Sequence, residues 1–312
     1  MAQTRDTVLL ALACAGGAVI APIAPFFGLP ICAAALAGLI YRGLPVAAAV
    51  VAGASIALVV AIRPTEALVL VPALVGVMLA ALAMRRYDVM TVAAWFVPLL
   101  AFALAARELG AAWLSGLTLR EYFTDVIEEA AALLSAAGAG DVFAADAVDM
   151  MLRLAPAGYL FTALLTAVPT LAAIMWSARK ADVELSRSPR IDMLDLSPHV
   201  LWLLFVGVGA GAAARIWGGP DGAFATVSLN FLLAAKVVLF VQGFAVISAL
   251  LKTAKVGRIG LIGAGIIALL IDGPTWIVSI TGLLDFWINF RKLARDGADG
   301  DARMKSTSGT GT

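Results

Sequence analysis

The chain has 312 residues, of which 62% are hydrophobic and 14% charged, and its mean hydropathy is +0.99. Soluble domains usually carry about 25% charged residues, so this chain has too few charges to cover a surface that faces water. Its net charge is +1, and it has no basic patch with interleaved aromatic residues, which argues against nucleic acid as a partner. We therefore expect an all-α fold, a polytopic transmembrane helical bundle surrounded by the lipid bilayer.

Apolar runs give the predicted spans, because a helix needs about 20 apolar residues to cross the hydrocarbon core. The run at 29–41 is short, and Pro22, Pro25 and Pro30 interrupt the first two runs near their junction. We expect about ten crossings, with eight or nine as alternatives. The runs, in order, are 8–27, 29–41, 44–62, 66–84, 90–106, 156–178, 199–216, 224–251, 257–272 and 274–290.

The positive-inside rule tests this alternation. With ten crossings and a cytoplasmic N-terminus, 16 Lys or Arg fall on the cytoplasmic side, five fall on the other side, and Lys236 lies within a run. The bias predicts that both termini are cytoplasmic. Residues 1–27 are expected to be a retained first helix rather than a signal peptide, because the apolar run continues past any plausible cleavage site.

Four segments follow from this pattern. Residues 1–106 are expected to form an N-terminal membrane bundle, residues 156–291 a C-terminal membrane bundle, and residues 292–312 a disordered cytoplasmic tail. Between the bundles, residues 107–155 carry three Arg and eight Asp or Glu. Their apolar positions recur at helical spacing, which predicts a short amphipathic helical insertion on the outer face, either lying on the bundle or acting as a lid or docking face.

Catalytic and metal-binding patterns are missing from the sequence. Cys14 and Cys32 lie in apolar runs without metal-ligand spacing, and His199 is the one histidine. No paired catalytic carboxylates and no Ser/His/Asp set can be assembled from the sequence. We therefore expect no enzymatic activity, no cofactor and no metal site, and we interpret both cysteines as small buried residues.

The informative polar residues lie in the last three runs. Lys236 is deep in run 224–251, where a charge costs about 2.5–3.5 kcal/mol on insertion scales and should face protein or water. A pair between Lys236 and Asp285 is one hypothesis; the alternative leaves Asp285 at the cytoplasmic interface and Lys236 bonded to helix carbonyls. The candidate substrate-binding residues are Lys236, Asn230, Gln242, Asp272, Asp285 and Asn289.

Small residues in the first and seventh runs recur at four-residue spacing. Ala11 and Ala15 form one such pair, and Gly207 and Gly211 form another. Small residues at this spacing let helices approach closely in lipid. They predict either packing within the chain or docking of a membrane partner subunit.

Two segments carry a family resemblance. The stretch Val241-Gln242-Gly243-Phe244-Ala245-Val246, with Asn230 upstream, and the stretch 282–292, Gly-Leu-Leu-Asp-Phe-Trp-Ile-Asn-Phe-Arg-Lys, resemble the YybS-like family of uncharacterised bacterial membrane proteins. That family is distantly similar to the S components of energy-coupling-factor transporters, which capture a vitamin or a metal and dock on an energising ATPase module. The resemblance implies a multi-pass protein of the bacterial cytoplasmic membrane, with Ala11 and Ala15 on a docking helix.

The sequence is consistent with two alternative functions. One is a transport-type protein that binds a small solute in the C-terminal bundle, which predicts a water-accessible cavity around Lys236. The alternative is a non-transport scaffold or assembly protein that docks partner proteins, which predicts a dry ion pair and an exposed apolar groove.

Overall fold

The computed structural model describes residues 2–136, 147–185, 194–219 and 222–292. These residues form eleven α-helices with short 3-10 and π segments, and the described ranges contain no strand. The predicted tail at 292–312 lies outside them except for Lys292. The helices are α1 (Ala2–Ile20), α2 (Pro25–Tyr41), α3 (Pro45–Ile62), α4 (Ala67–Ala83), α5 (Val89–Leu114), α6 (Leu119–Ala136), α7 (Ala147–Lys180), α8 (Leu201–Ala213), α9 (Ala223–Thr253), α10 (Arg258–Thr275) and α11 (Ile277–Ile288).

The chain divides into two compact units, which are described separately. Unit 1 comprises residues 1–188 and 210–230, and unit 2 comprises residues 189–209 and 231–312. Helix α7 belongs to unit 1 together with α1 to α6, and the four segments expected from the sequence stay a prediction. Helices α8 and α9 each contribute residues to both units.

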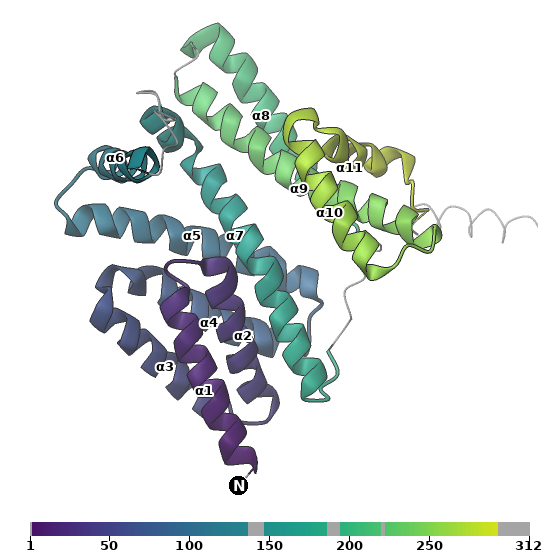
Figure 1. Ribbon diagram of the computed structural model, residues 1–312. Coiled ribbons are helices and arrows are strands. Elements are labelled where there is room, and N and C mark those ends of the chain that lie inside the picture. Colours follow the sequence, from purple (N-terminus) through teal and green to yellow (C-terminus); the bar gives the residue numbers. More distant parts are fainter. Residues whose placement is uncertain (1, 137–146, 186–193, 220–221, 293–312) are drawn as a thin grey trace, which may run out of the picture. The chain divides into compact units, whose positions relative to one another are not determined.

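Helix α2 is the centre of unit 1. It packs against α1, α3, α4 and α7, and α5 packs against α4 and α7 (Figure 1). Its buried positions are mostly Ala, Gly and Leu, including Cys32, Ala33, Leu36 and Leu39, which are at most 1% exposed. Side chains tie α2 to its neighbours, because Tyr41 donates to the Ala81 carbonyl at 2.9 Å and Ser177 donates to the Ala34 carbonyl at 2.8 Å.

The turn between α1 and α2 explains how two proline-interrupted runs become a close hairpin. Pro22 lies in the turn, and Pro25 occupies the first position of α2, where its missing N–H costs nothing. Pro30 lies inside α2 and does not end it. A Cβ at Gly17 would lie 2.8 Å from the Gly28 carbonyl oxygen, so only glycine allows the two backbones to approach this closely.

The predicted acidic insertion contains α6, which lies against α5 and α7. Its Glu121, Asp125, Glu128 and Glu129 are exposed, whereas Ile127 is buried. The turn and the start of the second predicted pattern, residues 137–146, fall outside the described residues.

The expected ten crossings are not confirmed. Six stretches are long and apolar enough to span a membrane, and a seventh results if α10 and α11 count as one broken span. Every predicted run coincides with a helix, but α2 has only 17 residues and the first turn of α1 is polar. The six are 45–62, 64–83, 89–114, 149–180, 198–217 and 223–253.

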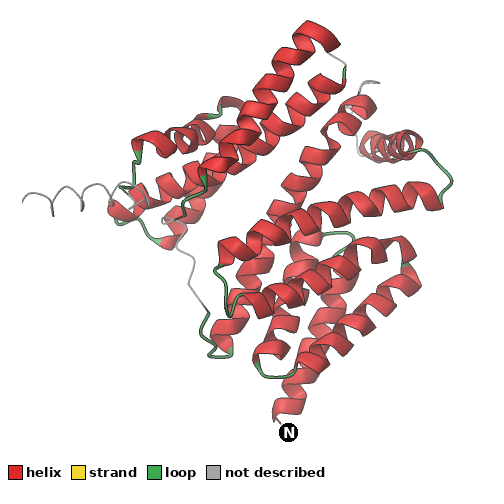
Figure 2. Ribbon diagram, turned by 180° about the vertical axis from the view of Figure 1, so that it is seen from behind, coloured by secondary structure: helices red, strands yellow, loops and turns green. Residues whose placement is uncertain are grey.

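Unit 2 is built on the second part of α9 and on the broken pair α10 and α11. The axes of α10 and α11 differ by 95° across a break at Trp276, which has a left-handed backbone (φ 59°). Pro274 near the end of α10 is consistent with this break, because proline removes a helical hydrogen bond. Figure 2 shows the bent pair from behind.

Helices α9 and α11 touch through glycine. A Cβ built on Gly243 would overlap the Val278 carbonyl, and one built on Gly282 would overlap the Leu239 carbonyl and lie 2.6 Å from the Gly243 nitrogen. Both glycines belong to the two segments that carry the family resemblance. The backbones are therefore in direct contact at this crossing, which brings Lys236 and Gln242 of α9 close to α11.

We predict that Gly243→Ala destabilises the protein by about 1–3 kcal/mol, because the added methyl group forces α11 away from α9. The measurement is the thermal unfolding midpoint of the purified protein in detergent. The matched control is Gly263→Ala, where a Cβ meets nothing within 4 Å and the substitution should stabilise helix α10 by about 0.5–1 kcal/mol. Equal midpoints for the two variants would contradict the close crossing.

Candidate functional site

Lys236 lies at the break between α10 and α11. Its Nζ donates to the Gly273 carbonyl oxygen at 2.8 Å and lies 4.6 Å from the centre of the Trp276 ring. That carbonyl is in the last turn of α10, where the helix dipole is negative. The ammonium group therefore has a hydrogen bond, a helix end and an aromatic face to offset its loss of water.

Asp272 accepts hydrogen bonds from free donor groups on the α11 side of the break. It is 3% exposed, and its carboxylate accepts from the Ser279 backbone N–H at 2.9 Å and from the Ser279 hydroxyl at 2.7 Å. Ser279 is in the first turn of α11, where backbone N–H groups have no helical partner and the dipole is positive. Asp272 thus serves as a cap for α11 from a position on α10.

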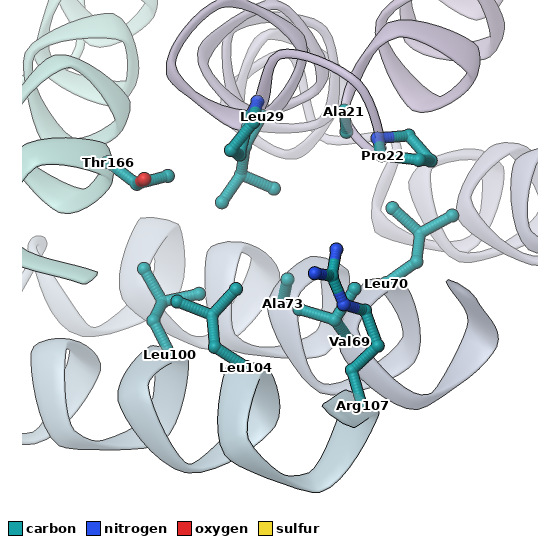
Figure 3. A pocket seen from close by; sticks show the side chains of 11 residues that line it. Ala21, Pro22, Leu29, Val69, Leu70, Ala73, Leu100, Leu104, Arg107 and Thr166 are labelled. Atoms are coloured by element: carbon teal, nitrogen blue, oxygen red, sulfur yellow. The ribbon is translucent and has the colours of Figure 1, made fainter. Parts of the chain in front are cut away.

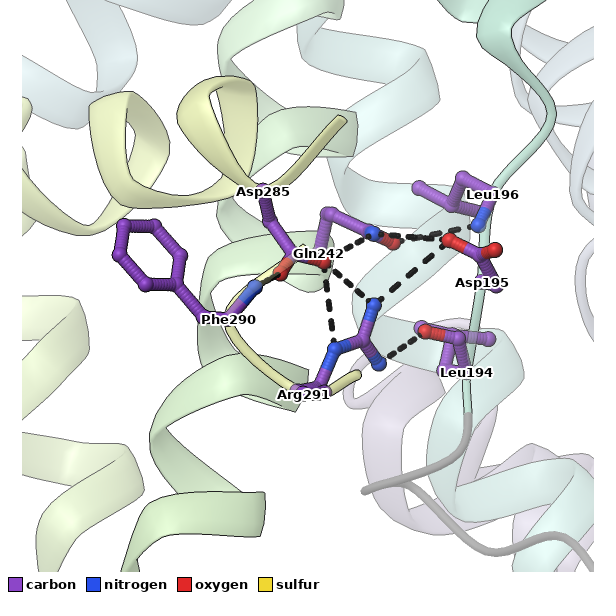
Figure 4. Close-up of polar contacts among 7 residues, drawn as sticks. All are labelled: Leu194, Asp195, Leu196, Gln242, Asp285, Phe290 and Arg291. Carbon is purple, nitrogen blue, oxygen red and sulfur yellow. Dashed lines mark hydrogen bonds and ion pairs between the residues drawn. The ribbon is translucent and has the colours of Figure 1, made fainter. Parts of the chain in front are cut away.

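A second polar cluster, which we call the Arg291 cluster, joins the end of α11 to α9 and to the segment 194–196 (Figure 4). Asp285 Oδ2 accepts from Arg291 Nη2 at 2.7 Å and from Gln242 Nε2 at 3.0 Å. Asp285 is fully buried and the Arg291 side chain is 2% exposed, so this is a dry ion pair. The remaining Asp285 oxygen accepts from the Phe290 backbone N–H at 2.9 Å.

The segment 194–196 completes the Arg291 cluster. Arg291 Nη1 donates to the Leu194 carbonyl, and Nη2 lies 3.7 Å from an Asp195 carboxylate oxygen. Gln242 Oε1 accepts from the Leu196 N–H at 3.2 Å, while its Nε2 lies 3.3 Å from Asp195. One arginine and one glutamine thereby anchor a loop segment to two helices.

The structure does not gather the predicted substrate-binding residues into one site. Asp285 pairs with Arg291 and Lys236 bonds the Gly273 carbonyl, so the hypothesised Lys236–Asp285 pair does not form. Asn230 lies in unit 1, where it donates to the Arg153 carbonyl at 2.6 Å and accepts from the Ala157 N–H at 2.9 Å. Asn289 ends α11 with a left-handed backbone (φ 49°).

Arg291 was missed as a site residue because the sequence places it just after the last run, where a basic residue is expected to face the cytoplasm. The usable signal was Asn289, a residue type that adopts the left-handed conformation and ends helices. A chain that turns at Asn289 can return Arg291 toward Asp285, six residues earlier.

Two of the four predicted docking residues contribute to contacts between α8 and α9. A Cβ at Gly207 would lie 2.9 Å from Leu232, and one at Gly211 would lie 2.8 Å from the Ser228 hydroxyl. Ala11 and Ala15 are half-buried on α1. Docking of a partner through any of these residues stays a prediction.

Unit 1 contains an apolar cavity of about 40 Å³ (Figure 3). Among the described residues that line it, Arg107 is the one charged side chain and Thr166 the one hydroxyl. The apolar wall consists of Ala21, Pro22, Pro25, Leu29, Val69, Leu70, Ala73, Leu100 and Leu104.

Thiol and carboxylate groups do not assemble into a metal centre in the parts of the chain that the structure describes. Cys14 and Cys32 are both free and fully buried, which confirms their interpretation as small buried residues. Cys32 Sγ donates to the Cys14 carbonyl at 3.3 Å, and Ser55 donates to Cys14 Sγ at 3.6 Å.

We predict that Arg291→Met destabilises the protein by about 3–5 kcal/mol, because it leaves the Asp285 carboxylate buried without its counter-charge. The double variant Asp285→Asn, Arg291→Met should recover part of this loss, since the uncompensated charge is gone. Thermal unfolding midpoints of the two single variants and the double variant measure the coupling. Additive effects would show that the ion pair has no energetic role.

Comparison with known proteins places the chain in a family. The model of the family described as "Predicted membrane protein (DUF2232)" matches residues 7–286. No curated protein matches the chain. No solved structure matches it either. Because the family model covers most of the chain, and because the helices are apolar enough to span a membrane, this protein belongs to the DUF2232 family of predicted membrane proteins.

Proposed function

We propose that this protein is a transport-type protein of the bacterial cytoplasmic membrane, and that the break between α10 and α11 forms part of its site for a small solute. The observation that carries the proposal is a bent helix pair with Lys236 and Asp272 at the break. Discontinuous membrane helices commonly form solute and ion sites, because their free backbone groups and dipole ends can bind charge. Ionisable residues within apolar helices are candidates for such sites.

The lengths of the two helices support a re-entrant hairpin. Helix α10 has 18 residues and α11 has 12, which at about 1.5 Å per residue correspond to about 27 and 18 Å. The hydrocarbon core is about 30 Å thick, so α11 alone is too short to cross it. A bend of 95° also prevents the two helices from forming one straight crossing.

The charge pattern favours the same topology. Lys252 and Lys255 precede α10, and Lys292 follows α11. The positive-inside rule places both groups on the cytoplasmic side. A hairpin that enters and leaves from the cytoplasm satisfies this, and with six spans it keeps both termini on one side.

The chemistry at the break suggests what the solute carries. Lys236 offers a cation that would suit an anionic solute group or a proton-coupled step. The Gly273 carbonyl, which it bonds at 2.8 Å, can exchange its donor for a solute N–H or a water molecule. In this proposal Lys236 is a binding residue, and no catalytic step is assigned to the protein.

A second function is favoured by the Arg291 cluster. Its dry ion pair is the feature expected of a scaffold or assembly protein that docks partners. In that case Lys236 and Asp272 are structural charges, and partner proteins would bind the exposed faces of the helices. An S-component-like protein that docks an energising ATPase module would combine both features, with the Arg291 cluster as its frame.

We predict that Lys236→Met abolishes solute capture while the protein still folds. Loss of the ammonium removes the donor to the Gly273 carbonyl, which should cost about 1–3 kcal/mol of stability. Mass spectrometry of the protein purified gently from its native membrane measures the retained metabolite in the wild type, in Lys236→Met and in the exposed control Lys252→Met. A metabolite retained equally by all three proteins, or recovery of envelope proteins without any metabolite, would refute the site.

We predict that the ends of the α10–α11 pair are accessible from the same side of the membrane. Single cysteines at Val256, Thr275 and Lys292, in a background with Cys14 and Cys32 replaced by alanine, report this through an impermeant thiol reagent. In inside-out vesicles, positions 256 and 292 should both react, and position 275 should react if the break lines a water-filled cavity. Reaction of 256 and 292 from opposite sides would show a broken span.

A further inference from the structure

Unit 1 has a second cavity, which is larger than the cavity drawn in Figure 3 and is lined by a different arginine. Its volume is about 170 Å³, compared with about 40 Å³ for the first. It lies at the ends of α1 and α3 and at the turn that follows α1. We call it the Arg63 groove, and its lining residues are Val19, Pro22, Ile23, Val59, Ile62 and Arg63.

The packing of α1 against α3 gives the groove its apolar floor. The two helices are joined where Ser55 of α3 donates to Cys14 Sγ of α1 at 3.6 Å. One turn further along α3, Val59 is 3% exposed, whereas Ile23 and Ile62 are 74% and 63% exposed. The groove is therefore closed at Val59 and open to the surroundings of the protein at Ile23 and Ile62.

The Arg63 groove lies at the depth where a membrane span meets the lipid head groups. Helix α3 is long and apolar enough to span a membrane, and its 18 residues correspond to about 27 Å, close to the hydrocarbon thickness of about 30 Å. Arg63 is the first residue after α3. An arginine at the end of a span extends its guanidinium to the head groups, so the apolar walls beside it lie at the depth of the acyl chains.

The described part of unit 1 does not neutralise the guanidinium of Arg63. Arg42, before the other end of α3, pairs with Asp6 at 3.0 Å, and Arg107 contacts Glu66 and Glu108. Arg63 is exposed, and it forms no ion pair with a described residue. Its N–H donors can therefore bind an acceptor from outside these residues.

A phospholipid matches this combination of one cation and an apolar groove. Guanidinium groups bind phosphate through charge-assisted hydrogen bonds, which are often bidentate. The groove has more than about ten times the 10–15 Å³ that one water needs, which is room for several methylene groups. A soluble anion would use Arg63 and leave the apolar walls empty.

The charge of the groove indicates which head group fits. Among the described residues that line it, Arg63 is the one polar side chain, and no carboxylate is present. The ammonium of a zwitterionic head group therefore has no partner in the groove, whereas a head group with a net negative charge complements Arg63.

We propose that the Arg63 groove binds an anionic phospholipid, with the phosphate on Arg63 and the first methylene groups of an acyl chain on Val59. This site goes beyond the function proposed above, because it lies in unit 1 and shares no residue with Lys236 or Asp272 in unit 2. The two proposals can therefore fail separately.

The experiment is a lipid titration of the delipidated full-length protein in detergent, measured by native mass spectrometry. Phosphatidylglycerol is compared with phosphatidylethanolamine that carries the same acyl chains. We expect the first phosphatidylglycerol to bind about fivefold more tightly, because one arginine faces one net negative charge. Arg63→Gln should remove this preference. The matched control Arg215→Gln, which changes an exposed arginine near the end of the span 198–217 that lines neither cavity, should keep it.

A second variant tests the apolar half of the site. Ile23→Trp places a larger side chain at the exposed edge of the groove, so the protein should fold and the first lipid should bind more weakly. Inorganic phosphate at millimolar concentration should not displace phosphatidylglycerol. Four results would overturn the proposal: equal affinity of the wild type for the two lipids, equal loss of the preference in Arg63→Gln and Arg215→Gln, unchanged lipid binding in Ile23→Trp, and displacement by phosphate, which would indicate a site for a soluble anion.

Discussion

A helix break between apolar helices leaves carbonyl and N–H groups without helical partners, and unit 2 is organised around this constraint. The break at Trp276 frees the Gly273 carbonyl at the end of α10 and the Ser279 N–H at the start of α11. Lys236 bonds the first at 2.8 Å and Asp272 bonds the second at 2.9 Å. Each charge has the sign that the adjacent helix dipole requires. The glycine crossing of α9 and α11 brings Lys236 within reach of the break, so packing and electrostatics depend on each other.

Magnitudes show why a lysine is tolerated in this position. Its insertion cost is about 2.5–3.5 kcal/mol. A hydrogen bond from a charged donor contributes about 1.5–3 kcal/mol, the Trp276 ring about 0.5–2, and the helix end up to about 2. These terms are similar in size to the cost, so no counter-ion such as Asp285 is required. Asp285 is thereby left to Arg291, whose planar guanidinium donates from both Nε and Nη2 to Asp285 Oδ2.

Composition and run length were sufficient to predict a helical membrane protein and the position of every apolar helix. They failed on the number of crossings, because run length does not record a 95° bend or the polar start of α1.

Four polar residues of the candidate site were predicted correctly to lie buried or half-buried in unit 2: Lys236, Gln242, Asp272 and Asp285. Their arrangement was not predicted, because they form two clusters instead of one. Their separation depends on the left-handed turns at Trp276 and Asn289, which a tryptophan in particular does not signal. The ion pair of Arg107 and Glu66 was not predicted, because the two residues are 41 positions apart and each sits at an end of an apolar run.

The ion pairs of the two units differ in how completely their polar atoms are hydrogen-bonded, and this difference bears on function. In unit 2 the ion pair of Arg291 and Asp285 is closed by Gln242, by backbone groups and by the segment 194–196. Networks in which every partner is satisfied are rigid, and exchanging any member for a solute would leave a costly vacancy. In unit 1 the Glu66–Arg107 contact is loose, and one buried oxygen has no donor. The closed Arg291 cluster is therefore better suited to hold the parts of unit 2 together than to exchange a ligand.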